Sequence, residues 1–315
     1  MRTLRLPDVL TKSLLVPIVA TMMGAGHTLR SNGGAGASSP RPFHPSVVAT
    51  TLFGSSTRVG DLGQGGRHNG RYVGFDTDVY PGDGAMLAWR HDESPYQWVG
   101  YYLTAPCHKD VSWAGKRATL TEMGWGLAVI YVGQQIWDVT ATRSRRRRWR
   151  DRRTATQCSR TLVTAARGTA EAKDAIEKTL TEGFPLGTTV FLDLEHMDAI
   201  PQAMRDYYRA WTAYVLADGR YRPGIYTHTY NADQVYADVR TVYDSIGGEG
   251  DPPFWVAGHP SLFSVYKAPS EVGHHFAVAW QGLLDVFDTR NGVRLPIDVS
   301  VASVPSPSEE YALNE

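Results

Sequence analysis

The sequence at positions 191–195 reads Phe191-Leu192-Asp193-Leu194-Glu195 and places two carboxylates one residue apart inside an apolar run. On a β-strand, residues i and i+2 point to the same side, so Asp193 and Glu195 are expected to project together. Two neighbouring like charges repel, and one carboxyl is therefore expected to keep its proton near neutral pH. A proton donor beside an anion suits acid-catalysed bond cleavage, above all of glycosidic bonds.

Further short apolar segments recur on both sides of this stretch. Several are continuously apolar and rich in β-branched residues, as expected for parallel strands that are covered on both faces. The sequence predicts strands at 72–76, 98–103, 126–132, 189–194, 224–227, 254–257, 277–281 and 297–301.

Amphipathic helical segments separate most of the predicted strands. Ser and Asn are favoured helix N-caps, Pro is favoured in the first turn, and Gly commonly follows the last turn. The predicted helices run from Ser112 to 123, over 168–180, from Pro201 to before Gly219, and from Asn231 to before Gly247-Gly248. The last connection is shorter, and Asn291-Gly292 is typical of a hairpin turn.

This alternation indicates the α/β class. Strands with intervening helices over about 230 residues fit a (β/α)8 barrel of the TIM type, with room for irregular final units. An open doubly wound sheet is the alternative. No Gly-rich phosphate loop follows the first strand, which argues against a nucleotide-binding sheet.

Polar side chains stand at the ends of many predicted strands, where a (β/α)8 barrel carries its working groups. They are Asp76, Asp78, Gln134, Gln135, Asp193, Glu195, Tyr226, His228, Trp255, His259, Trp280, Gln281 and Asp298. Buried acids are costly unless paired or used, so acids converging from three strands favour a site. A magnesium or calcium site from Asp76, Asp78 and Asp193 is chemically possible. We expect instead that no metal and no cofactor are used.

Six of these segments follow one another in an informative order. They are Gly74-Phe75-Asp76, Asp193-Leu194-Glu195, Ile225-Tyr226-Thr227, Phe254-Trp255-Val256-Ala257, Ala279-Trp280-Gln281 and Ile297-Asp298. The order resembles the successive strand motifs of family 25 glycoside hydrolases, which are lysozyme-type muramidases that cut peptidoglycan. The chain is more similar still to an actinobacterial family of exported, glycoside-hydrolase-like proteins defined by a domain of unknown function. The likeness covers residues 70–303.

The resemblance implies roles for individual residues. Glu195 would be the general acid that protonates the leaving oxygen, and Asp193 would stabilise positive charge at the sugar carbon. Asp76 and Asp298 would orient the sugar or tune Glu195. The implied substrate-binding residues are Asp78, Tyr226, Trp255, Trp280 and Gln281. Asp78 departs from the muramidase pattern, in which a small polar residue usually follows the first acid, and an inactive carbohydrate-binding barrel is therefore the main alternative.

An arginine-rich segment at 143–153 carries eight Arg and one Asp, a local charge of +7 in a chain whose formal net charge is zero. It is predicted to be a loop insertion between the third strand and the next helix. Arg145, Arg146, Arg147 and Arg148 are candidates for binding an anionic polymer of the cell envelope. A solvated loop without a partner is an equally weighted interpretation, and no dedicated nucleic-acid partner is expected.

The two ends of the sequence differ from its centre. Residues 1–26 combine early basic residues with an apolar stretch and resemble a signal peptide, which would make the protein secreted or envelope-associated, with cell-wall polysaccharide as its partner. Residues 27–69 are rich in Gly, Ser and Pro and are predicted to be a flexible linker, and 304–315 a disordered tail. Cys107 and Cys158 fall in loops on one barrel face and could be joined after export, but two separate thiols are the favoured interpretation.

Overall fold

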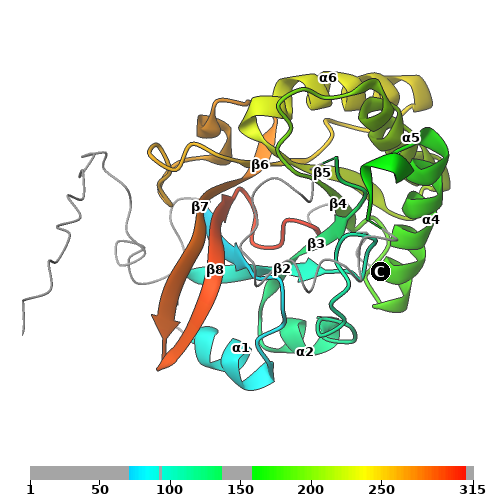
Figure 1. The fold of residues 1–315 in the computed structure, drawn as a ribbon. Helices are drawn as coiled ribbons and strands as arrows, with labels where there is room; N and C mark the ends of the chain where they lie inside the picture. The colour runs from blue at the N-terminus through cyan, green and yellow to red at the C-terminus, as the bar shows by residue number, and fades with distance from the viewer. Residues whose placement is uncertain (1–70, 92–93, 137–157, 310–315) are drawn as a thin grey trace, which may run out of the picture. The chain divides into compact units, whose positions relative to one another are not determined.

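The computed structural model describes residues 71–91, 94–136 and 158–309, which form a closed barrel (Figure 1). Its strands are β1 (Tyr72–Asp76), β2 (Tyr96–Tyr102), β3 (Gly126–Val132), β4 (Thr189–Leu194), β5 (Arg222–His228), β6 (Phe254–Ala257), β7 (Ala277–Arg290) and β8 (Val293–Ala302). Each predicted strand overlaps one of these, so the predicted α/β barrel is confirmed. Closure of the sheet excludes the open doubly wound alternative.

The last strand departs from an all-parallel barrel. Strands β1 to β7 pair in parallel, whereas β8 runs antiparallel to both β7 and β1. Asn291 and Gly292 join β7 to β8 with φ values of 45° and 76°, as a tight hairpin turn requires. The predicted hairpin is therefore confirmed, and Figure 1 shows the β7–β8 pair as a long ribbon that extends past the barrel.

Helices cover the outside of the barrel, with α4, α5 and α6 along one side and across the top of the view in Figure 1. The helices are α1 (Asp83–Trp89), α2 (Arg117–Glu122), α4 (Ala165–Thr181), α5 (Gln202–Asp218) and α6 (Thr229–Ile246), with short 3-10 turns η2 (Arg160–Leu162) and η3 (Pro269–Val272). Helix α5 follows Pro201 and ends at Gly219, and α6 ends at Gly247, as predicted. Helix α1 was not predicted.

Two predicted N-caps are wrong, because both side chains bond elsewhere. Helix α2 begins at Arg117, and the Ser112 hydroxyl accepts a hydrogen bond from the Tyr80 amide at 2.8 Å. Asn231 lies inside α6, where its amide group accepts from the Met197 backbone N–H and donates to the Met197 carbonyl. The cap of α6 is His228.

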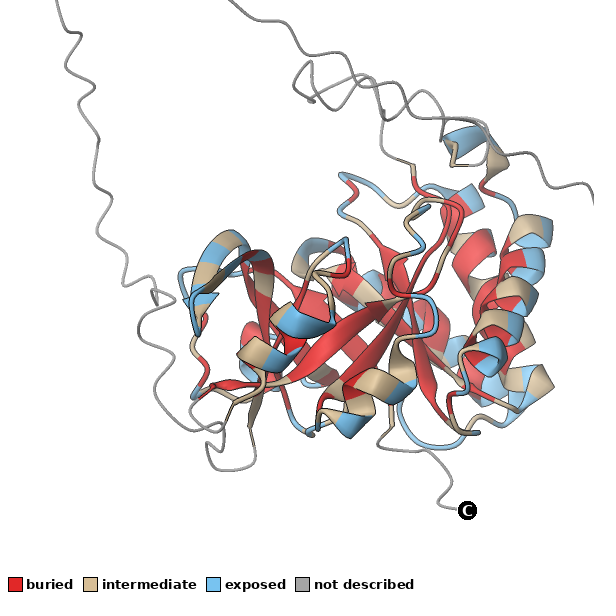
Figure 2. Cartoon of the chain, turned by 90° about the horizontal axis from the view of Figure 1, so that it is seen from below, coloured by how far each residue is buried: buried red, intermediate tan, exposed pale blue. Residues whose placement is uncertain are grey.

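The interior of the barrel is filled with large aromatic side chains, and β1 to β6 are largely buried, whereas the second half of β7 and the start of β8 are exposed or half-buried (Figure 2). The ring centroid of Trp255 lies 5.3 Å from that of Trp98 and 5.9 Å from that of Phe191. Gly74 makes room for them, since a Cβ at this position would lie 2.1 Å from the Trp98 ring. The lower interior is thus a packed core, and only the mouth at the end of the parallel strands is polar.

The segment after β8 is more ordered than predicted. Ser308 is fully buried, and its hydroxyl accepts from the Val129 amide at 2.7 Å. Its carbonyl accepts from the Thr189 amide at 2.6 Å, so the segment bridges β3 and β4. The prediction of a disordered tail from 304 onward is therefore wrong as far as residue 309, because serine hydroxyls and backbone pair with strand ends that composition does not identify.

Cys107 and Cys158 form a disulfide with a Cα–Cα distance of 4.9 Å. The interpretation as two separate thiols is therefore wrong. The bond joins the loop after β2 to the segment that leads into η2 and α4, two regions that pairing of β2 with β3 brings to one end of the barrel.

Several predictions lie outside the described residues. They are the leader at 1–26, the whole of the linker at 27–69 and the arginine-rich segment at 143–153. In the part of the chain that the structure describes, no helix has both the length and the hydrophobicity needed to span a membrane.

Candidate functional site

The register of the barrel brings the predicted acids to one mouth. Asp193 lies near the end of β4 and pairs with Tyr226 of β5, while Asp76 ends β1 and pairs with Asp298 of β8. Asp298 reaches this level only because β8 is antiparallel. In a parallel strand over 297–301 it would stand at the opposite end of the barrel.

The Tyr226 hydroxyl lies within electrostatic reach of all four acids. Burial raises the pKa of Tyr226 well above its ordinary value, and the negative charges of Glu195, Asp193, Asp76 and Asp298 raise it further. The hydroxyl therefore stays protonated. It donates a hydrogen bond to Gln281 Oε1 at 2.6 Å.

Asp76 is held by two donors. Tyr102 Oη donates to its Oδ2 and Gln281 Nε2 to its Oδ1, both at 2.8 Å. Burial, followed by the charge of Asp298, raises the pKa of Asp76, while the two hydrogen bonds act in the opposite direction. Tyr102, Asp76, Gln281 and Tyr226 thus form a continuous hydrogen-bonded chain across the mouth.

Asp193 is buried, with 7% of its surface exposed, and its Oδ1 atom makes no hydrogen bond within the described residues. Burial raises the pKa of Asp193, and the charges of Glu195 and Asp76 raise it further. The direction agrees with the expectation that one acid of the 193–195 pair keeps its proton. Glu195 itself is half-buried and so lies closer to solvent than Asp193.

Gln135 positions this pair and was not among the predicted site residues. Its side chain is 2% exposed, Nε2 donates to the Asp193 carbonyl at 2.8 Å, and Oε1 accepts from the Glu195 amide at 3.2 Å. The amide group therefore fixes the backbone on both sides of Leu194. The polar pair Gln134-Gln135 at the end of the third strand was a partial signal for this role, but it did not identify the contacts with residues 193 and 195.

Asp298 depends on a bulge in β7. Burial raises the pKa of Asp298 to about 6, although the Asp285 amide donates to its Oδ1 at 2.6 Å. Asp285 has a φ of 52°, and the β7–β8 register shifts between Leu283 and Val286. A bulge turns the backbone away from its usual pairing, and here it aims an amide at the carboxylate.

Asp78 lies at the rim of the mouth. It is exposed, and its carbonyl lies 2.8 Å from Nε2 of His108. The His108 ring stacks on Tyr102 with centroids 4.7 Å apart, which links the rim to the hydrogen bonds of Asp76. Sequence reasoning did not identify Tyr102 or His108.

Trp255 and Trp280 do not reach the surface of the mouth. Both side chains are fully buried, and their indole N–H groups donate to Ser300 Oγ and to the Gly258 carbonyl. Because neither side chain has exposed surface, both pack beneath the mouth. They do not form the predicted wall of a substrate groove.

A family model described as "Rv2525c-like, glycoside hydrolase-like domain" matches residues 88–282. The chain belongs to this family. The predicted membership in a glycoside-hydrolase-like family is confirmed, and no curated protein matches the chain in sequence.

Solved structures also resemble this glycoside hydrolase-like domain. An uncharacterized B. stearothermophilus protein is 18% identical with a TM-score of 0.50, over 73% of this chain and 95% of the other, which supports the barrel fold alone. The Mycobacterium tuberculosis Tat-secreted protein Rv2525c in complex with L-tartrate is 17% identical with a TM-score of 0.44, over 72% and 93%. A family GH25 lysozyme from Aspergillus fumigatus is 14% identical with a TM-score of 0.42, over 74% and 93%.

Histidines form one edge of the mouth of the glycoside hydrolase-like domain. The rings of His196 and His228 meet edge to face at 4.9 Å, and burial together with His196 and His259 lowers the pKa of His228. Within the described residues no group of three or more His, Cys, Asp or Glu side chains is arranged to hold a metal ion. The mouth thus gathers carboxyl groups whose pKa values are raised by burial and by neighbouring negative charges.

Proposed function

We propose that the domain is a glycoside hydrolase that cleaves peptidoglycan-type cell-wall glycan by acid-assisted breakage of the glycosidic bond. The observation that carries the proposal is the convergence of Asp76, Asp193, Glu195 and Asp298 around the Tyr226 hydroxyl. Groups with perturbed pKa values gather at functional sites, because a fold gains no stability from crowding buried acids. Membership in a glycoside-hydrolase-like family supports the same reaction class.

In the proposed mechanism Glu195 protonates the leaving oxygen, because it is the half-buried acid of the pair and stands beside the buried Asp193. Asp193 stabilises positive charge at the sugar carbon. Burial and the neighbouring charge of Glu195 raise the pKa of Asp193, and in this proposal the proton held by the pair is donated from Glu195 while Asp193 is left as the anion. Gln135 keeps the two at a fixed spacing through their backbone.

Asp76 and Asp298 act on the other side of the mouth in this proposal. Asp76 is oriented by Tyr102 and Gln281, and Asp298 by the Asp285 amide. In the proposal both acids orient a sugar and tune Glu195. Asp78 and Tyr226 complete the proposed contacts, with Tyr226 donating near the reacting centre.

We also propose that the protein works outside the cytoplasm, in the cell envelope or secreted, on cell-wall polysaccharide. The Cys107–Cys158 disulfide supports this location, because such bonds persist in oxidising compartments. The leader-like pattern at 1–26 points the same way. Polymer binding by Arg145–Arg148 lies outside the described residues and stays a prediction.

The test is release of reducing ends from purified peptidoglycan and from a chitooligosaccharide by the full-length protein. Glu195→Gln should lower the rate by about 10²- to 10⁴-fold, the usual contribution of a general acid, and Asp193→Asn should also be strongly impaired. Glu122→Gln is the matched control, since Glu122 is exposed at the end of α2, the helix that leads into β3.

The results separate the alternatives. Full activity of Glu195→Gln would remove Glu195 from the mechanism. A wild-type protein that binds insoluble cell wall but releases no product would instead be a catalytically inactive carbohydrate-binding barrel.

A further inference from the structure

A polar cleft lies on the outer side of the barrel, against β3 and α4. It has a volume of about 480 Å³ and opens between the loop after β2 and α4. Its charged and hydroxyl lining, which defines the lateral cleft, consists of Lys109, Tyr131, Arg167, Glu171, Asp174 and Lys178. This volume is within the range of small-molecule sites.

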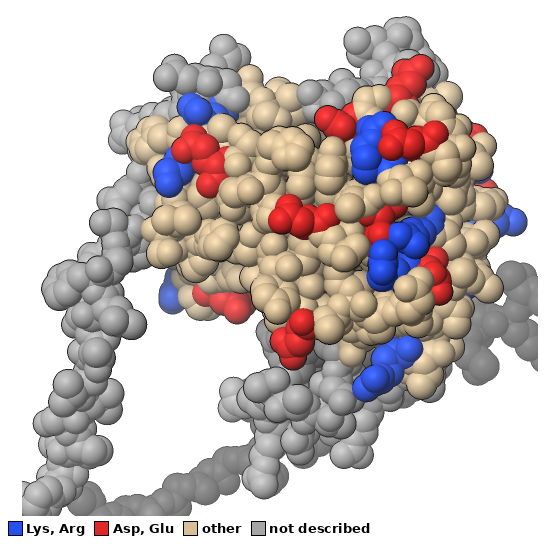
Figure 3. Space-filling model, turned by 90° about the horizontal axis from the view of Figure 1, so that it is seen from above, with Lys and Arg blue, Asp and Glu red and all other residues tan. Residues whose placement is uncertain are grey.

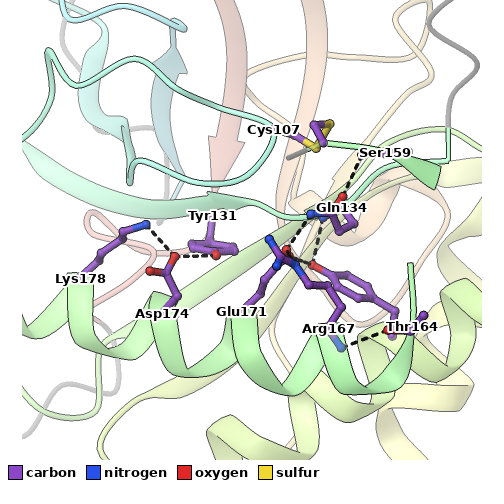
Figure 4. Close-up of polar contacts among 11 residues, drawn as sticks. Cys107, Tyr131, Gln134, Ser159, Thr164, Arg167, Glu171, Asp174 and Lys178 are labelled. Carbon is purple, nitrogen blue, oxygen red and sulfur yellow. Dashed lines mark hydrogen bonds and ion pairs between the residues drawn. A yellow bond between two sulfur atoms is a disulfide. The ribbon is translucent and has the colours of Figure 1, made fainter. Parts of the chain in front are cut away.

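The lateral cleft is separate from the acids of the mouth because β3 lies between them. Ile130 points inward, since a Cβ at position 100 would touch both its Cδ1 and the Cβ of Asp76. The next residue, Tyr131, therefore points outward to α4. Figure 4 shows Tyr131 facing the side chains that project from this helix.

Both acids of the lateral cleft are already satisfied by the protein. Glu171 is 3% exposed and accepts from Gln134 Nε2 at 2.7 Å, from Arg167 Nε at 2.5 Å and from the Tyr207 hydroxyl at 2.5 Å (Figure 4). Asp174 Oδ2 accepts from the Tyr131 hydroxyl at 2.8 Å and from Lys178 Nζ at 2.6 Å. These hydrogen bonds hold Glu171 and Asp174 in place at the base of the lateral cleft.

The cations of the lateral cleft are not fully used. Lys109 is exposed and makes no hydrogen bond or ion pair within the described residues. Partial burial lowers the pKa of Lys109, and the positive charges of Lys178 and Arg167 lower it further. Arg167 engages Glu171 only through Nε, which leaves its terminal nitrogens without a partner in the described chain. Three cations against two acids give a net charge of +1.

The walls of the lateral cleft are held in place before any ligand arrives. The disulfide joins Cys107 to Cys158, and the Cys107 amide donates to the Val132 carbonyl at 3.1 Å. The Ser159 amide donates to Gln134 Oε1 at 3.0 Å, and Gln134 in turn holds Glu171. A site built this way loses little entropy on binding.

We propose that the lateral cleft is a phosphate-binding site in which Lys109 makes the principal contact. The unpaired donors are the Lys109 ammonium group on one wall and the Arg167 terminal nitrogens on the other. A tetrahedral phosphate accepts hydrogen bonds from several directions, whereas a planar carboxylate is best matched by a single guanidinium fork, and that of Arg167 is partly turned to Glu171. The phosphate is either a free ion or a diester carried by an envelope polymer.

Isothermal titration of the full-length protein at low ionic strength tests this site, with inorganic phosphate in one arm and soluble poly(glycerol phosphate) in the other. Lys109→Gln should weaken phosphate binding at least about 10-fold, equivalent to loss of one charge-assisted contact. Lys173→Gln is the matched control, since Lys173 is an exposed lysine of α4 that does not line the cleft. Reducing-end release should be the same in both variants.

Binding in the first arm alone would identify a free anion as the ligand, and binding in the second alone a polymer diester. The proposal is overturned if the wild type binds neither, if Lys109→Gln binds as well as the wild type, or if Lys173→Gln loses as much affinity. Equal affinity for acetate at matched ionic strength would also overturn it, because the site would then not be selective for phosphate.

Discussion

The protonation of Asp298 makes the free energy of unfolding depend on pH. Its pKa is raised by burial to about 6 from an ordinary value of 3.8. Between these values the folded protein holds a proton that the unfolded chain has released. The free energy of unfolding should therefore fall as the pH rises from about 4 to 6, by at most about 3 kcal/mol from this group.

Asp298→Asn should flatten this pH dependence, as measured by urea denaturation at several pH values. Asp206→Asn, which changes an exposed acid of α5, should leave the slope unchanged. A slope in Asp298→Asn as steep as that of the wild type would show that the proton is held elsewhere, with Asp76 and Asp193 the next groups to examine.

Gly100 is the second residue on which the mouth depends. It lies in β2, and a Cβ there would stand 2.6 Å from the Cβ of Asp76 and 2.9 Å from Ile130 Cδ1. Gly100→Ala should cost about 1–3 kcal/mol of unfolding free energy through overpacking, and should reduce glycan cleavage by displacing Asp76.

The comparison for this variant is Gly84→Ala, since a Cβ at position 84 in α1 meets no atom within 4 Å. Alanine is also the better helix former, so Gly84→Ala should be neutral or slightly stabilising in the same thermal denaturation. Equal stability of the two variants would mean that β2 can shift to accommodate the methyl group.

At the residue scale, the sequence was sufficient to find the acids but not the groups that orient them. Asp76, Asp193 and Glu195 follow apolar strands directly, and strand ends can be read from hydrophobicity. Gln135 and Tyr102 act through contacts with other strands, and such contacts follow from barrel register. The backbone amide of Asp285 contacts Asp298 because β7 has a bulge at this point. The pattern of side chains in the sequence does not predict that bulge.

Among the elements, strands were predicted better than helix starts. Buried strands are continuous runs of apolar residues, so their positions can be predicted from the local sequence without knowing which strands pair. Ser112 and Asn231 were misplaced as caps because their side chains find partners in Tyr80 and Met197, which are distant in sequence. A hairpin turn at Asn291-Gly292 implies that β8 runs antiparallel to β7. That Asp298 then lies opposite Asp76 is known only from the register between β8 and β1.

The disulfide ties the loop after β2 to the segment before α4 across a sequence separation of 51 residues. Closing a loop of this length removes entropy from the unfolded chain worth about 4 kcal/mol. The double variant Cys107→Ser with Cys158→Ser should therefore unfold more easily by roughly this amount in guanidinium titrations.

Reducing agent provides the internal control for this prediction. It should destabilise the wild type and leave the double serine variant unchanged. If the variant were as stable as the oxidised protein, the two loops would be held by their backbone contacts with Val132 and Gln134 alone.

On the part of the surface that the structure describes, many charges of opposite sign lie close together. On the face shown in Figure 3, acidic and basic side chains are interspersed and no broad patch of one sign is formed. Part of this pairing joins helices, since Arg205 and Arg209 of α5 both contact Asp238 of α6. Any broad attraction to polyanions therefore depends on surfaces other than this face.

The reversed last strand brings the end of β8 to the pole of the barrel at which β1 begins. Tyr72, the first residue of β1, pairs with Ala302, the last of β8, while Asp76 and Asp298 pair at the other pole. In an all-parallel barrel the eighth strand would finish beside the carboxylates. Here both Tyr72 and Ala302 lie at the pole opposite the carboxylates, so an immobilisation tag joined to the barrel through either end would attach away from the mouth.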